Sequence, residues 1–419
     1  MKHLIFTPQS FGYTSHSNGA DIALLLHTIL YKYITDSRYE WGDGVYLRTD
    51  YLQNFISSRI LKNVFTYCED NGFIDIDKHY VVGGRCRRYS LGAAFTNETM
   101  VPLETEDFRL CSRLDKLETF KRSERTKNFR TIDRYIMNAV ETRTDYSRLL
   151  ELSPENLIYF ATCRPKRERG KEKDVDIKIE RMKMLCEYIS RREHNGIKDK
   201  NGRLYNTVTY LQKEMRPLLT LDGQNIIFQD ISHTHPVLLF VLLNNQTHKN
   251  YSNPIQINQI KVHNSLMKCS IREDEVRHEL EKYQHMVESA TLYHEIAKDL
   301  GVEIGVAKVQ LLSFFFDKPR LIENCKYTKW FANSFPYIHD FILESKQQDY
   351  RFLGNFLQQV EVDVVLNRVC HELMLQYPGI PLLTIHDAIG TTEPYTQIVN
   401  SKLKTEFKRL GICPQIKEQ

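Results

Sequence analysis

Ile226-Ile227-Phe228-Gln229-Asp230-Ile231-Ser232 and Pro381-Leu382-Leu383-Thr384-Ile385-His386-Asp387-Ala388-Ile389 are two apolar runs that each carry one aspartate. An acidic side chain in such a run needs a partner that offsets its loss of water. Each run has the length and composition of a β-strand, and the second leads into a turn. Two such strands can place Asp230 and Asp387 side by side, which is how proteins hold Mg²⁺ for phosphoryl transfer.

The composition sets broad limits on the class of protein. The chain has 419 residues, of which 42% are hydrophobic, so it is long enough for two or three domains. The longest apolar run, residues 236–243, is too short to span a membrane. The nine cysteines include no Cys-x-x-Cys pair, which argues against a zinc site and for a reducing compartment. We therefore expect a cytoplasmic protein with no membrane partner.

Basic residues gather in two parts of the chain although the net charge is only +4. Residues 121–130 and 164–203 both contain more lysine and arginine than aspartate and glutamate. Such clusters suit the backbone of a nucleic acid. A solvated helix face is the alternative interpretation of the same charges.

Residues 20–92 read as a compact unit that resembles a winged helix. Residues 20–36 and 57–71 have helical spacing, and short strand-like pieces follow at 73–77, 79–82 and 85–91 around a Gly83-Gly84 turn. Thr49 or Asp50 can cap a further helix between these two, and in that fold the third helix, at 57–71, enters a groove of DNA while the wing touches phosphates. The predicted DNA contacts are Lys62, Arg85, Arg87 and Arg88. Winged helices also mediate protein contacts, so a protein partner remains an alternative.

Residues 100–195 are predicted to be mostly helical and charged. A break is expected from Arg164 to Gly170, followed by an amphipathic helix from Asp174 to His194. Beyond residue 195 strands and helices alternate, which together with the N-terminal pattern predicts an α+β fold.

Four segments of the C-terminal half carry the chemistry. In order they are Asn201-Gly202-Arg203-Leu204 with Thr209-Tyr210-Leu211-Gln212; Asp230-Ile231-Ser232; Lys308 to Phe316; and Asn355-Phe356-Leu357-Gln358 with the His386-Asp387 run. In the third, Lys308, Leu312 and Phe316 recur every four residues of a helix-compatible run that starts near Ser289, so they share one helix face. Over residues 195–415 this order resembles the palm and fingers of family A DNA polymerases and the related phage-type single-subunit RNA polymerases.

The resemblance implies a two-metal catalytic site. Asp230 and Asp387 would bind two Mg²⁺ ions, with Mn²⁺ as an alternative, and the backbone carbonyl of Ile231 would complete one coordination shell. Lys308 would meet the nucleoside triphosphate and belongs with the two aspartates among the predicted catalytic residues. The remaining roles are nucleotide binding, by Lys308, Leu312, Phe316 and His235, and primer–template binding, by Arg203, Asn355, Gln358 and His386.

The sequence departs from the family at positions that choose the nucleotide sugar. His235 stands where the DNA polymerases carry a glutamate and the RNA polymerases a glycine, Ile304 replaces an arginine, and Phe316-Asp317 replaces Tyr-Gly. Because Phe316 has no hydroxyl to donate, one contact that favours ribose is lost. We therefore expect deoxynucleoside triphosphates as substrates, with an RNA-synthesising polymerase as the alternative.

Two further functions stay open. A His-Asp pair also defines the HD-type phosphohydrolases, which need the pair on a helix, whereas Pro378-Gly379-Ile380-Pro381 and Gly390-Thr391 around it favour a strand and turn. A non-catalytic DNA-binding replication initiator or regulator with a decayed palm is the second.

The predicted domains are a winged-helix-like unit at 1–98, a helical basic region resembling a reduced thumb at 99–195, and a polymerase palm at 196–419 with a fingers insertion at about 240–325. No segment resembles a proofreading exonuclease. A short polymerase joined to a winged helix would suit a plasmid, a phage or another mobile element, or a defence system. Protein partners and oligomeric state are left open by the sequence.

Overall fold

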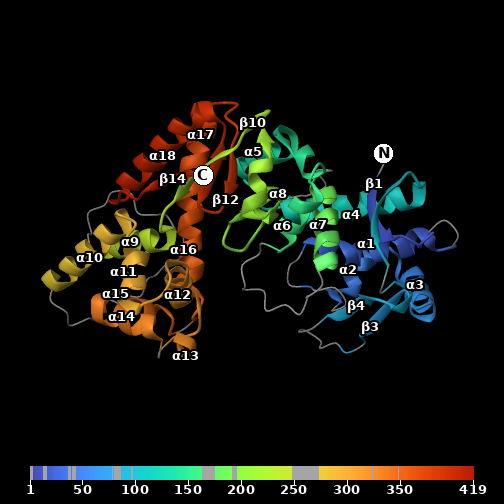
Figure 1. Ribbon diagram of the computed structural model, residues 1–419, viewed down its shortest axis with the longest axis horizontal. Coiled ribbons are helices and arrows are strands. Elements are labelled where there is room, and N and C mark those ends of the chain that lie inside the picture. The colour runs from blue at the N-terminus through green and yellow to red at the C-terminus, as the bar shows by residue number, and fades with distance from the viewer. Residues whose placement is uncertain are drawn as a thin grey trace. The chain divides into compact units, whose positions relative to one another are not determined.

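The computed structural model describes residues 3–12, 17–35, 39, 44–77, 79, 86–95, 98–162, 175–190, 196–247, 273–322, 325–347 and 349–419. The fold is α+β, as predicted, with mostly helical segments and small antiparallel sheets (Figure 1). The chain divides into two compact units. Unit 1 comprises residues 1–128, 144–197 and 206–223, and unit 2 comprises residues 129–143, 198–205 and 224–419.

Within the described residues, no helix is both long and apolar enough to cross a membrane.

Unit 1 contains small antiparallel sheets and the helices that pack on them. Strand β1 (His3–Pro8) pairs antiparallel with β5 (Met100–Thr105), and helix α1 (Gly19–Thr35) packs on β1 with nearly all of its side chains buried. The second sheet has the strand order β2-β4-β3, formed by β2 (Val45–Leu47), β3 (Ile74–Asp77) and β4 (Arg87–Leu91). The other elements of this unit are α2 (Thr49–Gln53), α3 (Ser58–Asp70), α4 (Phe108–Thr126), β6 (Thr144–Asp145), α6 (Pro154–Thr162), α7 (Val175–Ser190), α8 (Thr207–Tyr210) and β9 (Thr220–Leu221).

The division of the chain differs from the three predicted domains. The predicted boundary after residue 98 falls between β1 and β5, which pair along their whole length and so belong to one unit. Helix α7 packs on both α1 and β5, so the region predicted as a separate helical domain joins the N-terminal unit. Helix α5 (Thr131–Asn138) belongs instead to unit 2, where it packs on the C-terminal elements. The predicted strand at 79–82, the Gly83-Gly84 turn and the break at 164–170 lie wholly or mainly outside the described residues.

The centre of unit 2 is a four-stranded antiparallel sheet with the order β12-β13-β11-β14. Its strands are β11 (Ile227–Ile231), β12 (Leu383–Ile385), β13 (Ala388–Thr391) and β14 (Ile416–Glu418). Helix α18 (Thr396–Arg409) packs on β11, β13 and β14. Both aspartate-bearing runs therefore form neighbouring parts of one sheet. The shorter strands near the start of this unit are β7 (Ile197–Lys198), β8 (Leu204–Tyr205) and β10 (Gln224–Asn225).

Helices make up the rest of unit 2. They are α9 (Thr234–Thr247), α10 (Glu273–Glu288), α11 (Leu292–Leu300), α12 (Ile304–Phe316), α13 (Pro319–Ile322), α14 (Lys326–Ser334), α15 (Pro336–Ser345), α16 (Phe352–Val362) and α17 (His371–Gln376). A π-helical segment, Asp363–Cys370, joins α16 to α17 in one continuous run (Figure 1). Buried aromatic rings connect α10, α12, α14 and α15, with Phe314, Phe331, Phe335 and Tyr283 in contact at centroid distances of 5.3–5.6 Å.

The helix-compatible run predicted from Ser289 to Phe316 is two helices in the structure. Helix α11 ends at Gly301, whose φ of +64° lies in the left-handed region that terminates helices. Helix α12 begins three residues later with Glu303 as its N-cap. The spacing of Lys308, Leu312 and Phe316 falls wholly inside α12, so their common face is retained.

Candidate active site

The register of the central sheet brings the two aspartates together. On β11, Asp230 lies opposite Ala388 of β13 and opposite Lys417 of β14. Asp387 directly precedes Ala388, so it is one residue away from the β13 partner of Asp230. The preceding residue, Gln229, is completely buried and accepts a hydrogen bond of 2.7 Å from Asn400 of α18. Because side chains alternate between the faces of a strand, Asp230 points to the face opposite α18.

The His386-Asp387 pair forms a two-residue turn. Ile385 pairs with Ala388, and His386 has a φ of +56°, a left-handed conformation that suits such turns. The imidazole of His386 meets the ring of Tyr205 edge to face at 5.1 Å. The pair is therefore on a hairpin, as the flanking sequence predicts, and lacks the helical setting that the phosphohydrolase interpretation requires.

Two neutral side chains contact the aspartates. The hydroxyl of Thr234 contacts both the carbonyl oxygen of Ile231, at 2.7 Å, and Oδ2 of Asp387. Gln419 donates from Nε2 to Oδ2 of Asp230 at 2.6 Å. The carbonyl oxygen of Ile231 and the carboxylate oxygen of Asp387 thus both contact Oγ1 of Thr234. Because this hydroxyl has only one hydrogen, it can donate fully to only one of these two oxygens at a time.

The oxygen atoms at this point are the ligands that Mg²⁺ prefers. Two carboxylates and a backbone carbonyl give the hard, anionic donor set of magnesium sites in phosphoryl-transfer enzymes, which bind through one or two carboxylates and keep several waters. Among the described residues there is no cluster of three or more histidine, cysteine, aspartate or glutamate side chains that could hold a metal. The residues present fit a magnesium site of the two-carboxylate kind and do not resemble a histidine or cysteine site.

Arg203 is buried in an ion pair that the sequence does not predict. Its guanidinium donates from Nε and Nη2 to the two carboxylate oxygens of Glu361, at 2.9 and 2.5 Å. Arg203 is 9% exposed and Glu361 is 1% exposed. In this structure the arginine predicted to contact a primer–template is therefore held by a bidentate carboxylate from α16.

Burial shifts the pKa values of the groups around this ion pair. Burial raises the pKa of Glu361 to about 7, although Arg203 lowers it, and the nearby charge of Asp387 raises it further. Burial also lowers the pKa of His235 to about 4, with Arg203 adding to the effect. Nε2 of His235 lies 4.0 Å from Glu361 and has no hydrogen-bond partner among the residues that the structure describes. His235 is therefore a neutral imidazole near pH 7.

Phe316 lies against His235 and against the backbone of α16. The ring of His235 meets that of Phe316 edge to face, at 5.2 Å and 85°. A Cβ atom on Gly354 would lie only 2.3 Å from Cδ1 of Phe316, so the ring occupies the space that any side chain at 354 would need. The predicted nucleotide-binding residues His235 and Phe316 are thus in direct contact.

The predicted lysine of α12 is exposed and lies near the same residues. Lys308 is exposed, while Leu312 and Phe316 on its helix face are half-buried, in contrast to the buried Phe314 and Phe315. The charge of Lys308 contributes to lowering the pKa values of both His233 and His235. The face that the spacing predicts therefore lies toward the residues around the aspartates.

A polar stripe on α16 lines the turn that carries Arg203. Asn201 donates from its amide to Oδ1 of Asn355 at 3.2 Å and to Oε1 of Gln358 at 2.6 Å. Asn355, Gln358 and Glu361 follow each other at intervals of three in α16, where Gln359 is the other polar residue. Asn355 and Gln358 were predicted from the sequence, whereas Glu361 and Asn201 were missed. Glu361 could have been found, because it continues the interval of three residues that separates Asn355 from Gln358.

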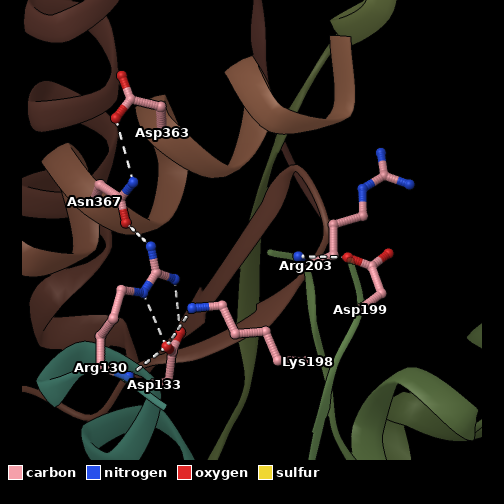
Figure 2. A network of polar contacts seen from close by, with 7 residues as sticks. All are labelled: Arg130, Asp133, Lys198, Asp199, Arg203, Asp363 and Asn367. Atoms are coloured by element: carbon pink, nitrogen blue, oxygen red, sulfur yellow. Dashed lines mark hydrogen bonds and ion pairs between the residues drawn. The ribbon is translucent and has the colours of Figure 1, made fainter. Parts of the chain in front are cut away.

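A second polar network supports this turn (Figure 2). Asp133 is completely buried and accepts hydrogen bonds from Nε of Arg130 at 2.9 Å and from Lys198 at 3.0 Å. Burial alone would raise the pKa of Asp133, but Arg130 and Lys198 reverse the effect and hold this pKa below its ordinary value. Figure 2 also shows Asn367 linking Arg130 to Asp363 on the π-helical segment. These contacts attach α5 and the end of β7 to the helix run that carries the stripe.

The carboxylate of Asp199 shapes the turn itself. It accepts hydrogen bonds from the backbone N–H groups of Asn201 and Arg203, both at 2.9 Å. Gly202 adopts a φ of +89° there, beside the side chain of Val362. The glycine of this segment is thus needed for a left-handed backbone close to α16.

The residues predicted to contact DNA from unit 1 are placed on α3 and β4. Lys62 is exposed on α3, and Arg87 and Arg88 are half-buried on β4. Arg85 lies outside the described residues.

Comparisons with known proteins identify no family. No family model and no curated protein matches the chain. Among solved structures, the polymerase domain of Pol1 from M. smegmatis, in complex with DNA primer-template and dNTP, is similar at a TM-score of 0.33 and 11% identity, over 74% of each chain. A likeness this weak does not establish the activity, so the proposals below depend on the geometry of the site.

Proposed function

We propose that this chain is a metal-dependent nucleotidyltransferase that adds nucleotides to a 3′-hydroxyl and releases pyrophosphate. The observation that carries the proposal is that Asp387 lies in the hairpin turn next to Ala388, the strand partner of Asp230, and that the Ile231 carbonyl and Asp387 contact one hydroxyl. Two carboxylates and a carbonyl, at the end of β11 and in the adjacent hairpin turn, suit Mg²⁺ or Mn²⁺ in a two-metal site.

The chain's own residues would divide the work. Asp230, Asp387 and the Ile231 carbonyl would hold two Mg²⁺ ions, which when bound supply positive charge to the attacking hydroxyl and to the phosphates. Lys308 would neutralise charge on the departing pyrophosphate from the exposed face of α12. His235, Leu312 and Phe316 would contact the nucleotide.

The polar stripe would face the nascent duplex. Asn355 and Gln358 present amide groups beside Asn201, a chemistry suited to hydrogen bonds with base edges and sugars. Arg203 and His386 would complete the primer–template contacts. In this proposal the central sheet of unit 2 serves as a palm, the segment from about residue 240 to 325 serves as fingers, and the basic helical region before residue 195 serves as a reduced thumb.

Deoxynucleoside triphosphates are the proposed substrates. Phe316 has no hydroxyl to donate to a ribose, and His235 with Phe316 places two rings in contact where the sugar is expected. A single-subunit polymerase that makes RNA is the alternative that the product analysis below distinguishes.

The arrangement of unit 1 supports a second candidate, a non-catalytic replication initiator or regulator that binds DNA. The order α1-β2-α2-α3-β3-β4 with a β2-β4-β3 sheet is the arrangement expected for a winged helix. Lys62 would then approach DNA from the exposed side of α3, with Arg87 and Arg88 close to the wing. A cytoplasmic role in the replication of a mobile element would suit either candidate.

A primer-extension assay tests the proposal. Purified protein is incubated with labelled dNTPs or NTPs, with or without a primer–template, and with Mg²⁺ or Mn²⁺. We expect extension of the primer by dNTPs, and no extension by Asp387→Asn although that variant keeps its fold by circular dichroism. Full extension by Asp387→Asn would contradict the metal assignment, and DNA binding without any incorporation would favour the non-catalytic candidate.

A further inference from the structure

Each carboxylate of the candidate metal site is contacted by an uncharged donor from a neighbouring element. Gln419, just after β14, donates its amide to Oδ2 of Asp230 at 2.6 Å. Thr234, the first residue of α9, contacts Oδ2 of Asp387 with its hydroxyl. Neither Gln419 nor Thr234 is among the site residues that the sequence predicted.

Both donors are held in place by backbone structure. The main chain of Gln419 exchanges two hydrogen bonds with Phe228 of β11, at 2.9 and 3.0 Å, two residues before Asp230. The hydroxyl of Thr234 also lies 2.7 Å from the carbonyl oxygen of Ile231, which limits its rotation. Each donor is therefore fixed relative to the strand that carries the aspartate or the carbonyl.

The chemistry of the two donors suits a site for a cation. A carboxylate that rotates must lose that freedom when it binds a metal, and this ordering weakens binding. An amide or a hydroxyl can restrict the rotation without neutralising the negative charge that attracts the cation, whereas a lysine or arginine in its place would neutralise it.

We propose that Thr234 and Gln419 are positioning residues that hold Asp387 and Asp230 in the orientation that binds a divalent cation. The proposal rests on the proposed function, since it assumes that these carboxylates bind metal. It assigns a role to the C-terminal strand β14 and to the first turn of α9.

The test measures binding of Mn²⁺ alone, without nucleotide, by electron paramagnetic resonance. Thr234→Val removes the hydroxyl with little change of shape, and Gln419→Met removes the amide from a side chain of similar length. Because each variant removes a hydrogen bond that restrains a carboxylate, each is expected to weaken Mn²⁺ binding about tenfold or more. Thr234→Ser keeps the hydroxyl and is expected to restore binding to within about threefold of the natural chain.

The chain offers a matched control for each variant. Thr396 begins helix α18 and donates to the carbonyl of Glu393 at 2.9 Å, the same local contact that Thr234 makes with Ile231. Gln415 lies directly before β14, as Gln419 lies directly after it, and donates its amide to the carbonyl of Ser289 at 3.0 Å. Thr396→Val and Gln415→Met should therefore lose comparable local stability without weakening Mn²⁺ binding.

The outcomes separate this proposal from the proposed function. If Asp230→Asn and Asp387→Asn weaken Mn²⁺ binding but Thr234→Val and Gln419→Met bind as the natural chain does, the positioning role is wrong and the metal site stands. If the two aspartate variants also bind Mn²⁺ normally, the metal site itself is wrong. Equal weakening by Thr396→Val or Gln415→Met would show a general loss of structure and would also overturn the positioning role.

Discussion

The contact between Gly354 and Phe316 leads to a prediction about stability. Gly354→Ala should destabilise the natural chain but stabilise a variant that lacks the Phe316 ring. Gly354 lies in the first turn of α16, where its φ is not positive, so alanine fits the backbone. A methyl group there would lie 2.3 Å from Cδ1 and 2.6 Å from Cε1 of Phe316. Ordinary contacts between carbon atoms are about 3.5–4.0 Å, so the ring must move by about 1 Å or more.

Two opposing free energies determine the size of the effect. Overpacking of this kind costs about 1–3 kcal/mol. Replacing glycine by alanine at a compatible position stabilises a protein by about 0.4–1 kcal/mol, because the unfolded chain loses conformational freedom. Gly354→Ala alone should therefore destabilise the protein by about 1 kcal/mol. In a Phe316→Ala background the clash is absent, and the same change should stabilise by about 0.5–1 kcal/mol.

A double-mutant cycle measured by urea unfolding tests this reasoning. The free energies of unfolding of the natural chain, the two single variants and the double variant give a coupling energy of about 1–3 kcal/mol if the ring packs on the glycine. A change of equal size and sign in both backgrounds would refute the packing of Phe316 on α16. If Gly354→Ala also raises the KM for the nucleotide, the position of the Phe316 ring affects nucleotide binding.

The two ion-pair networks give further predictions. Arg203→Lys keeps the charge beside Glu361 but loses the planar guanidinium that binds both carboxylate oxygens, so the free energy of unfolding in urea should fall by about 1.5–3 kcal/mol. The exposed pair of Arg351 and Asp349 provides the control, because Arg351→Lys should change the free energy of unfolding by less than about 0.5 kcal/mol. Asp133→Asn should destabilise the protein by about 3 kcal/mol at pH 7, because two cations lose a buried partner. The pKa of Asp133 is lowered in the folded state, so its contribution is present above about pH 4 and is lost as the pH falls further. The difference between natural chain and Asp133→Asn should therefore shrink at pH 3 in urea titrations, and a constant difference would contradict this assignment.

Patterns within single elements were accessible from the sequence. An aspartate in an apolar strand, the spacing of Lys308 and Phe316, and the short run around His386 all depend on the regular periods of strands and helices. These patterns predicted the α+β class, and they also predicted the meeting of Asp230 and Asp387. The roles of these residues in catalysis remain predictions.

Boundaries between units were less accessible. The pairing of β1 with β5 joins segments about a hundred residues apart, and no local pattern distinguishes that pairing from a separate N-terminal domain. Gly301 likewise divided a helix that the apolar spacing made continuous, because the spacing reports a helical face and not the conformation of a single glycine.

By itself, the sequence determined which residues are unusual for their surroundings: two acidic groups in apolar runs, and the polar Asn355 and Gln358 in a largely apolar segment. Only the tertiary structure decided their partners. Glu361 holds Arg203, the backbone of Gly354 receives the ring of Phe316, and Gln419 and Thr234 reach the two carboxylates. The physical reason is that periodicity acts within one element, whereas a partner far along the chain is set by strand register and by how whole elements pack.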